Sequence, residues 1–292
     1  MTRVDHATDD ANDLRPTWTG EGGSAFLVVL VVSALLAGCA AVPPDERLHS
    51  TLWVQTSAEY RVSAHQVYSL ATERLRQSVA DFPNTELALG TTDDVRPLAI
   101  IVDVDETILE NSGHTARGIL ARKGYSRESW RVWVQESAAP PVPGAIGYLQ
   151  AAAAMDITIF YVTNREHDLE EATRRNLATL GCPIRSDIDV LLTRGERPEW
   201  TRDKTTRREF VARSYAVIQL VGDDLRDFVS IPAGATDEDR VKLAESYSGR
   251  WGMVWFLLPN PIYGTWEQAL MPGGDSMFAQ PLEQKFKHLE TR

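Results

Sequence analysis

Five short apolar runs recur between residues 98 and 258, and more polar sequence separates each run from the next. The runs cover residues 98–102, 157–162, 188–192, 217–221 and 253–258. Continuous apolar runs of this length are typical of strands that are buried on both faces, and segments of helical character lie between them. The pattern therefore predicts an α/β fold, a Rossmann-like parallel sheet with helices on both faces.

Helical periodicity is clearest before the first of these strands. Apolar residues fall three or four positions apart from Tyr60 to Val79, which predicts a helix with one apolar stripe. Residues 81–94, which contain Pro, Asn, Gly and Asp, are expected to form a loop. Further helices are expected at residues 168–180 and 207–213.

Residues 108–142 lie between the first strand and the next helix–strand unit, and they have the length of a small helical cap. Trp130 and Trp133 stand three positions apart on an expected helix of this segment. Two interpretations stay open for them. They pack against the main domain, or they form an aromatic wall for a substrate's leaving group.

The apolar run at residues 25–38 is too short for a confident transmembrane span and is typical of the core of a signal peptide. It ends in Leu36-Ala37-Gly38-Cys39, and small residues directly before a cysteine resemble a bacterial lipobox. The motif predicts cleavage before Cys39 and lipidation of its thiol, so the mature protein would be exported and anchored to the lipid bilayer. A chance cysteine after an apolar run is the alternative. Residues 1–24 are net acidic, unlike most signal-peptide starts, which suggests that the true start codon lies further along.

Charge and cysteine content narrow the picture further. The net charge of -11 argues against binding of nucleic acid polymers, which depends on a basic surface. It does not exclude a small phosphorylated substrate, since a local cationic pocket can outweigh the global sign. If Cys39 is lipidated, Cys182 is the only thiol left and no intramolecular disulfide is expected. The oligomeric state stays open, with a homodimer among the alternatives.

The first apolar run leads directly into Asp103-Val104-Asp105. Two carboxylates packed together repel each other, and one keeps a proton unless a cation lies between them. The motif is therefore typical of a Mg²⁺ site, of a nucleophile paired with an acid/base, or of both. A solvated turn after a strand is the plain alternative.

Two further strands end in polar residues, at Thr163-Asn164 and at Asp223-Asp224. Ligands of open parallel sheets bind beyond the carboxyl ends of the strands, so these groups and the aspartates after the first strand are expected to meet. Together they suit phosphoryl transfer, which needs a nucleophile, a proton donor, a cation and donors for the phosphoryl oxygens.

Each group has an expected role in such a reaction. Asp103 can attack phosphorus, and Asp105 can protonate the leaving oxygen and later deprotonate water. Asp223 can complete a Mg²⁺ site with Asp103 and a backbone carbonyl near Asp105. Thr163 and the backbone around Asn164 can donate to the phosphate. Lys204 can neutralise charge between nucleophile and phosphate, although on its own it would be taken for a solvated surface lysine.

The order Asp-x-Asp-x-Thr, Thr163, Lys204 and Gly-Asp-x-x-x-Asp resembles the haloacid-dehalogenase-like (HAD) superfamily of phosphatases. Within it the chain resembles the class C acid phosphatases, which are exported bacterial lipoproteins. The segments that carry this closer resemblance are residues 55–60, 142–145, 160–165, 203–204 and 258–261.

The resemblance implies a Mg²⁺-dependent phosphomonoesterase that works through an aspartyl-phosphate and accepts small phosphorylated substrates, nucleoside monophosphates among them. It implies the roles given above for the matching residues and adds Asp227 as a support of the metal site. It also implies a division into a signal peptide at 1–38, a tether at 39–54 and a phosphatase domain at 55–292, with the cap inserted at about 108–142.

The chain departs from the family pattern in two places. Asp224 stands where the family often has asparagine, and its added charge could strengthen cation binding or raise a neighbour's pKa. Gly113-His114 stands where the family tends to have an aromatic residue, which puts a preference for nucleotides in doubt.

Two other functions stay open. One is a surface lipoprotein that binds a ligand or partner and has lost catalysis, which the complete motif set disfavours. The other is a dehalogenase of the same fold, which would need neither Asp105 nor a metal.

Overall fold

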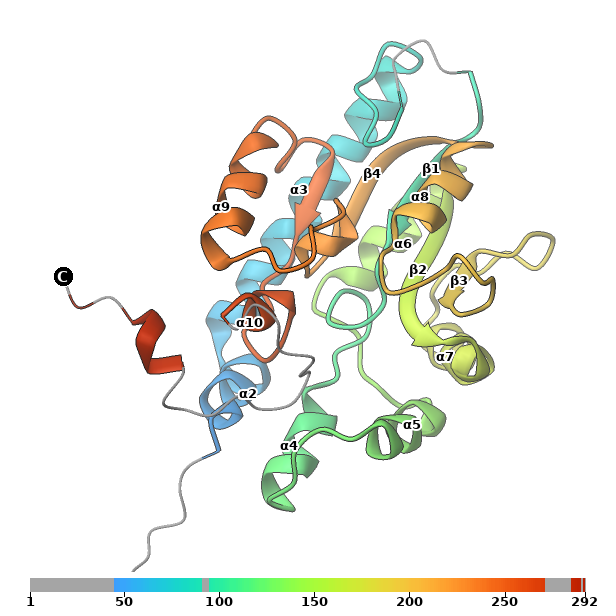
Figure 1. Cartoon of the computed structure of the whole chain (residues 1–292). Helices are drawn as coiled ribbons and strands as arrows, with labels where there is room; N and C mark the ends of the chain where they lie inside the picture. Colours follow the sequence, from blue (N-terminus) through green and yellow to red (C-terminus); the bar gives the residue numbers. More distant parts are fainter. Residues whose placement is uncertain (1–44, 91–94, 271–284, 290, 292) are drawn as a thin grey trace, which may run out of the picture. The chain divides into compact units, whose positions relative to one another are not determined.

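The computed structural model describes residues 45–90, 95–270, 285–289 and 291 (Figure 1). The predicted signal peptide, Cys39 and the first part of the predicted tether lie outside these residues. Among the described helices, none is both long and apolar enough to cross a membrane. Residues 47–54, which the sequence analysis assigned to the tether, belong to helix α2 (Arg47–Thr56). That part of the prediction was wrong. Pro43-Pro44 is typical of a linker, and the helix that begins at Arg47 has no continuous apolar pattern that would have revealed it.

A five-stranded sheet forms the centre of the described domain. Its strands are β1 (Leu98–Val102), β2 (Thr158–Glu166), β3 (Leu191–Arg194), β4 (Ala216–Gly222) and β5 (Trp255–Leu257). They lie in the order β3-β2-β1-β4-β5, and every neighbouring pair is parallel. The predicted α/β class with a parallel sheet is confirmed.

Helices cover the two faces of this sheet. The long helix α3 (Ala58–Asp81) packs with α6 (Ala145–Ala154) on one face, and α8 (Thr205–Ala212) and α9 (Asp237–Ser246) lie in front of the other (Figure 1). Outside the expected cap, the other helical elements are α7 (Glu170–Thr179), α10 (Thr265–Ala269) and the short turns η1 (His167–Leu169), η2 (Leu225–Asp227) and η3 (Phe286–His288).

The buried side of β4 carries one polar residue, Gln219, that ties the layers together. Its amide accepts a hydrogen bond from the Tyr148 hydroxyl of α6 at 2.7 Å and donates to the Ala71 carbonyl of α3 at 2.9 Å. A buried amide costs free energy unless its groups are paired, so this arrangement fixes the register of both helices on the sheet.

The segment expected to be a cap contains two helices, α4 (Ser112–Leu120) and α5 (Arg127–Glu136). The Ser126 hydroxyl accepts from the Ser129 N–H and thereby begins α5. Trp133 is buried and donates its indole N–H to Asn111 at 2.8 Å, whereas Trp130 is half-buried among other rings. The two tryptophans therefore differ, one packing inward and the other lining the surface between cap and sheet.

Strand β2 is longer than its apolar residues suggest. The sequence places its end at Thr163, but strand pairing resumes at Glu166, which lies opposite Arg194 of β3 after an irregularity in register. Polar residues can extend a strand at the edge where ligands bind, and apolar pattern alone does not detect them. The extension matters because it brings Arg165 into the site.

Candidate active site

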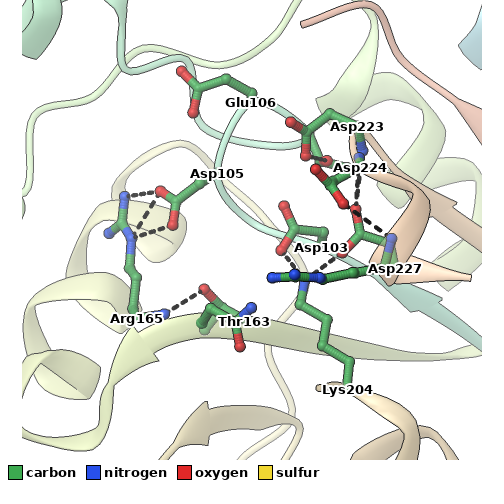
Figure 2. Close-up of polar contacts among 12 residues, drawn as sticks. Asp103, Asp105, Glu106, Thr163, Arg165, Lys204, Asp223, Asp224 and Asp227 are labelled. Atoms are coloured by element: carbon green, nitrogen blue, oxygen red, sulfur yellow. Dashed lines mark hydrogen bonds and ion pairs between the residues drawn. The ribbon is translucent and has the colours of Figure 1, made fainter. Parts of the chain in front are cut away.

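The predicted chemical groups gather at the carboxyl edge of the sheet. Asp103 and Asp105 follow β1, Thr163 lies within β2, and Asp223 follows β4 (Figure 2). Lys204 ends the loop that leads into α8. Adjacent parallel strands present their carboxyl ends side by side, so residues more than 100 positions apart in the chain meet here.

Lys204 is the centre of the charged group. Its ammonium donates to Asp103 and, at 2.6 Å, to Asp227, and only 4% of its side chain is exposed. Burial by itself would lower the pKa of Lys204, yet the two carboxylates raise it above the ordinary value of lysine. The expectation of a solvated surface lysine is excluded by this placement.

The carboxylates around Lys204 are crowded. Burial raises the pKa of Asp103 to about 7 against the lowering effect of Lys204, and the charges of Asp227 and Asp105 add to the rise. Burial raises the pKa of Asp223 well above its usual range, with further contributions from Asp227 and Asp103. One ammonium does not balance these groups, so the site has room in its charge balance for a further cation.

The oxygen atoms also fit a metal ion. Asp103, Asp223 and Asp227 each offer one carboxylate oxygen, and these three atoms all lie within 4.8 Å of one another. Hard divalent cations such as Mg²⁺ prefer carboxylate oxygens and keep several waters. The donor set therefore fits the predicted cation in kind and in charge.

Asp227 is already heavily used by the protein itself. One of its oxygens accepts from Lys204, and the other accepts from the N–H groups of Asp223 at 3.1 Å and Asp224 at 3.0 Å. Asp227 thus shapes the turn after β4 and leaves Asp103 and Asp223 as the freer ligands. The supporting role of Asp227 that the family resemblance implies stays a prediction.

Asp105 points away from this group, contrary to the expectation that it converges with Asp103 on one point (Figure 2). Its carboxylate accepts three hydrogen bonds from the Arg165 guanidinium, two from Nε at 3.0 and 3.3 Å and one from Nη2 at 2.8 Å. The Asn111 amide donates a fourth, at 3.0 Å. The side chain of Arg165 is 1% exposed, so a buried cation fixes the orientation of Asp105.

Arg165 was not assigned a role from the sequence. It lies two positions after Thr163 on β2, and residues two apart on a strand share one face. The spacing from Thr163 therefore pointed to Arg165, but the strand predicted from the apolar run ended before Arg165, so the spacing was not applied to it.

Thr163 and Asn164 divide their tasks. Thr163 is fully buried, and its hydroxyl oxygen accepts from the Arg165 N–H at 3.1 Å, which leaves its proton free to donate. The Asn164 side chain donates to the Arg202 carbonyl at 3.0 Å and accepts from Arg207 at 2.7 Å. Its amide therefore holds the loop before Lys204, and the main-chain N–H of Asn164 stays the donor expected for a ligand.

Glu106 was not assigned a role by the sequence analysis, and in the structure its buried carboxylate connects three segments of the chain. It is 4% exposed with a φ of 57°. Its carboxylate accepts from the Asn111 N–H at 2.8 Å, from the Asn111 amide at 2.9 Å and from the Tyr263 hydroxyl. Burial, together with the charge of Asp105, raises its pKa to about 8. Glu106 thus joins the loop after β1 to the cap and to the segment after β5.

The segment after β5 contributes a second contact that the sequence analysis did not assign. The Asn260 amide donates to Asp223 at 2.8 Å. Asn260 follows the end of β5, so it stands at the same carboxyl edge as the aspartates. That position was visible in the sequence, although the partner was not.

The two departures from the family pattern have structural explanations. Asp224 accepts from the Thr265 N–H and from the Thr265 hydroxyl, each at 2.6 Å, so its charge holds the start of α10. Its charge is also one of those that raise the pKa of Asp223. Gly113 is required by Trp133, because a Cβ at that position would lie 2.7 Å from the indole.

Comparison with known proteins agrees with this geometry. Residues 39–266 match the model of the HAD superfamily, subfamily IIIB (acid phosphatase). The structure of the class C acid phosphatase from Bacillus anthracis is similar, with a TM-score of 0.74 and 27% sequence identity over 85% of this chain and 98% of that chain. The structure of the class C acid phosphatase from Bacillus anthracis with tungstate bound gives a TM-score of 0.73 and 26% identity, over 86% and 99% of the two chains.

Proposed function

This chain belongs to the acid phosphatases of HAD subfamily IIIB, and from that premise we propose that it hydrolyses small phosphomonoesters in a Mg²⁺-dependent reaction through an aspartyl-phosphate. Nucleoside monophosphates are candidate substrates. The observation that carries the proposal is the buried group in which Lys204 contacts Asp103 and Asp227, with Asp223 close by. Charged side chains that are buried so close together are more typical of functional sites than of the rest of a protein.

In the proposed reaction Asp103 attacks phosphorus, and the bond between phosphorus and the leaving oxygen breaks. Asp105 gives a proton to that oxygen and afterwards takes one from the water that attacks the aspartyl-phosphate. The Thr163 hydroxyl and the main-chain N–H of Asn164 donate to the phosphoryl oxygens. Lys204 stabilises the negative charge that Asp103 and the phosphoryl group share.

Asp103 and Asp223 would hold the Mg²⁺ ion, with the main-chain carbonyl of Asp105 as a further ligand. When bound, the ion supplies positive charge that screens the phosphate from the carboxylates. Two residues orient Asp223 for this task. The Asp227 carboxylate accepts from the Asp223 N–H, and the Asn260 amide donates to the Asp223 carboxylate. The tungstate named for the Bacillus anthracis enzyme is a tetrahedral oxyanion, and we expect it to compete with phosphate esters here as well.

The decisive experiment replaces the nucleophile with a residue of the same shape. We expect Asp103→Asn to lower phosphate release from 4-nitrophenyl phosphate by about 10³-fold or more, because an amide cannot form the intermediate. Thermal unfolding serves as the check that the variant is folded. Turnover at the wild-type rate in folded Asp103→Asn would overturn the proposal.

A parallel assay separates the remaining alternatives. Addition of EDTA is expected to stop turnover, and Mg²⁺ is expected to restore it. Halide release that survives EDTA would instead favour a dehalogenase. Absence of turnover with every phosphomonoester would favour the lipoprotein that has lost catalysis.

We also propose that the protein is exported and held at the membrane through a lipidated Cys39. The support is the motif Leu36-Ala37-Gly38-Cys39, and the family match begins at residue 39. Radiolabelled palmitate is expected to enter the wild-type protein in bacterial cells and to be absent from Cys39→Ala. Equal labelling of both would contradict the anchor.

A further inference from the structure

A second charged cluster lies beside the proposed active site, and here the charge is positive. Arg194 ends β3, Arg202 lies two residues before Lys204, and Arg127 is the first residue of α5. Glu166 of β2 joins two of these elements, because its carboxylate pairs with Arg194 at 2.6 Å and lies 3.5 Å from Arg131, which stands one turn after Arg127 on α5. Burial lowers the pKa of Arg194, Glu166 raises it, and the charges of Arg202 and Arg127 lower it again.

The cluster is firmly placed relative to the active site. The Asn164 amide donates to the Arg202 carbonyl at 3.0 Å, which fixes this loop against β2 next to Thr163. Two residues further along, Lys204 contacts Asp103. Arg202 is therefore held on the same short loop as the lysine of the active site.

Little negative charge balances these arginines. Glu166 pairs with Arg194 at 2.6 Å, but its other oxygen lies 3.5 Å from Arg131. Arg127 and Arg202 are exposed and form no ion pair within the described part of the chain. The N-terminus of α5 adds further positive potential at Arg127. Such a site is unusual on a chain whose net charge is -11.

A row of rings connects the cluster to the proposed acid/base. Tyr125 stands two positions before Arg127, and its ring lies 6.5 Å from that of Trp130. Burial raises the pKa of its phenol, Glu166 raises it too, and the charges of the three arginines lower it. Trp130 lies beneath the guanidinium of Arg165, at 5.6 Å, and Arg165 in turn pairs with Asp105 at 2.8 Å. A leaving group protonated by Asp105 would thus leave the reaction centre along Trp130 and Tyr125 toward the arginines.

We propose that Arg127, Arg194 and Arg202 form an anion subsite that binds a second phosphate or carboxylate on the leaving group of the substrate. The guanidinium fork suits both anions, because each accepts paired hydrogen bonds. The inference rests on the proposed function and narrows its substrate class to phosphomonoesters that carry a second negative group.

Matched substrates test the subsite. We expect the wild-type protein to show a higher kcat/KM for adenosine 3′,5′-bisphosphate than for adenosine 5′-monophosphate, and for fructose 1,6-bisphosphate than for fructose 6-phosphate. Arg202→Gln and Arg127→Gln should each reduce this ratio by about tenfold, the usual size of one lost charge-assisted contact. Raised ionic strength should reduce it too.

Arg76→Gln is the matched control, since Arg76 is 61% exposed on α3 and does not belong to the arginine cluster. It should leave the ratio unchanged. A wild-type ratio of one or below would overturn the subsite, and so would an equal fall in Arg76→Gln and Arg202→Gln.

A binding measurement separates this proposal from the proposed function. Calorimetric titration of Asp103→Asn with the same adenosine pair needs no turnover and should show tighter binding of the bisphosphate, by about tenfold, with the preference lost in Asp103→Asn/Arg202→Gln. If the wild-type protein releases no phosphate from any compound, the proposed function fails, while this titration still decides the subsite. Equal affinity for both ligands would refute the subsite alone.

Discussion

Single residues at this site are defined more by their partners than by their own chemistry. Asp103 and Asp105 are two positions apart and would be hard to distinguish from sequence alone. In the fold the first contacts Lys204 and the second contacts Arg165. The two cations separate the carboxylates, so each can take a different role in one reaction.

The pairing of Asp105 with Arg165 can be measured as a coupling free energy. Removal of one partner leaves a buried charge without its counterpart, so Arg165→Met is expected to lower the free energy of unfolding by about 3 kcal/mol. In Asp105→Asn/Arg165→Met most of that loss should be recovered. Urea unfolding of the four proteins gives the coupling directly, and additive losses would show that the pair is energetically unimportant.

The raised pKa of Asp103, at about 7, predicts how stability depends on pH. Burial keeps this carboxyl protonated in the fold between its ordinary value near 4 and pH 7, while the unfolded chain ionises. The metal-free protein should therefore lose stability as pH rises through that window. If Asp103 holds Mg²⁺ as proposed, the ion binds the ionised carboxylate, so its stabilising effect should grow over the same window.

Melting temperatures at pH 5 and pH 8, with and without Mg²⁺, test this expectation. The shift caused by Mg²⁺ should be larger at pH 8, and Asp103→Asn should abolish most of the difference. A shift that is equal at both pH values would show that Asp103 does not hold the ion.

Residue types indicated the site, but burial could not be foreseen for all of them. Asp103, Thr163 and Asp223 follow or end apolar runs, so their position was predictable from strand pattern. Lys204 lies in a run of charged residues that looks like solvated surface, and only the fold places its ammonium between two carboxylates. Local sequence does not record which distant chain segment covers a side chain.

At the scale of elements, the turn after β4 is the most demanding piece of backbone in the site. A Cβ on Gly222 would lie 2.4 Å from the Cβ of Asp227 and 2.3 Å from its carboxylate oxygen. Only glycine lets the strand end approach η2 so closely. The position of Asp227, and with it the pairing of Lys204, depends on this missing side chain.

Gly222→Ala is accordingly expected to displace Asp227, to lower the free energy of unfolding by about 2–4 kcal/mol and to reduce kcat strongly. Gly147→Ala, in the exposed part of α6 where a Cβ meets nothing within 4 Å, is the control. It should be stabilising by about 1 kcal/mol, because alanine favours helix. Similar unfolding curves for both variants would contradict the role of Gly222.

Strands and long helices were the most predictable elements, because continuous apolar runs indicate buried strands and apolar periodicity indicates helices. β1 was predicted with both of its ends correct, and α3 within a few residues. The polar extension of β2 and helix α2 were missed, since neither has a continuous apolar pattern. α2 is stabilised by its contact with α4, a tertiary effect that a local pattern does not contain.

At the scale of the whole molecule, the site is closed by the segment that follows β5. Asn260 reaches Asp223, and Tyr263 reaches Glu106. Asn260→Ala is expected to weaken Mg²⁺ activation by about tenfold with a small loss of stability, because Asp223 loses the partner that orients it. Activity titrated with Mg²⁺ measures the shift.

Tyr263→Phe is the companion variant, since it removes a contact to Glu106 and none to Asp223. Its Mg²⁺ titration should match that of the wild-type protein. If both variants shift the titration equally, the segment stabilises the site as a whole and Asn260 has no separate part in orienting Asp223.

The closing contacts made by Asn260 and Tyr263 have a consequence for synthesis. A ribosome produces Asp103, Lys204 and Asp223 before it produces the segment that completes their surroundings. The nascent chain therefore carries Asp103, the proposed nucleophile, for well over a hundred residues of synthesis before Asn260 and Tyr263 are made. The contacts that Asn260 and Tyr263 make with Asp223 and Glu106 can form only after almost all of the described domain has been synthesised.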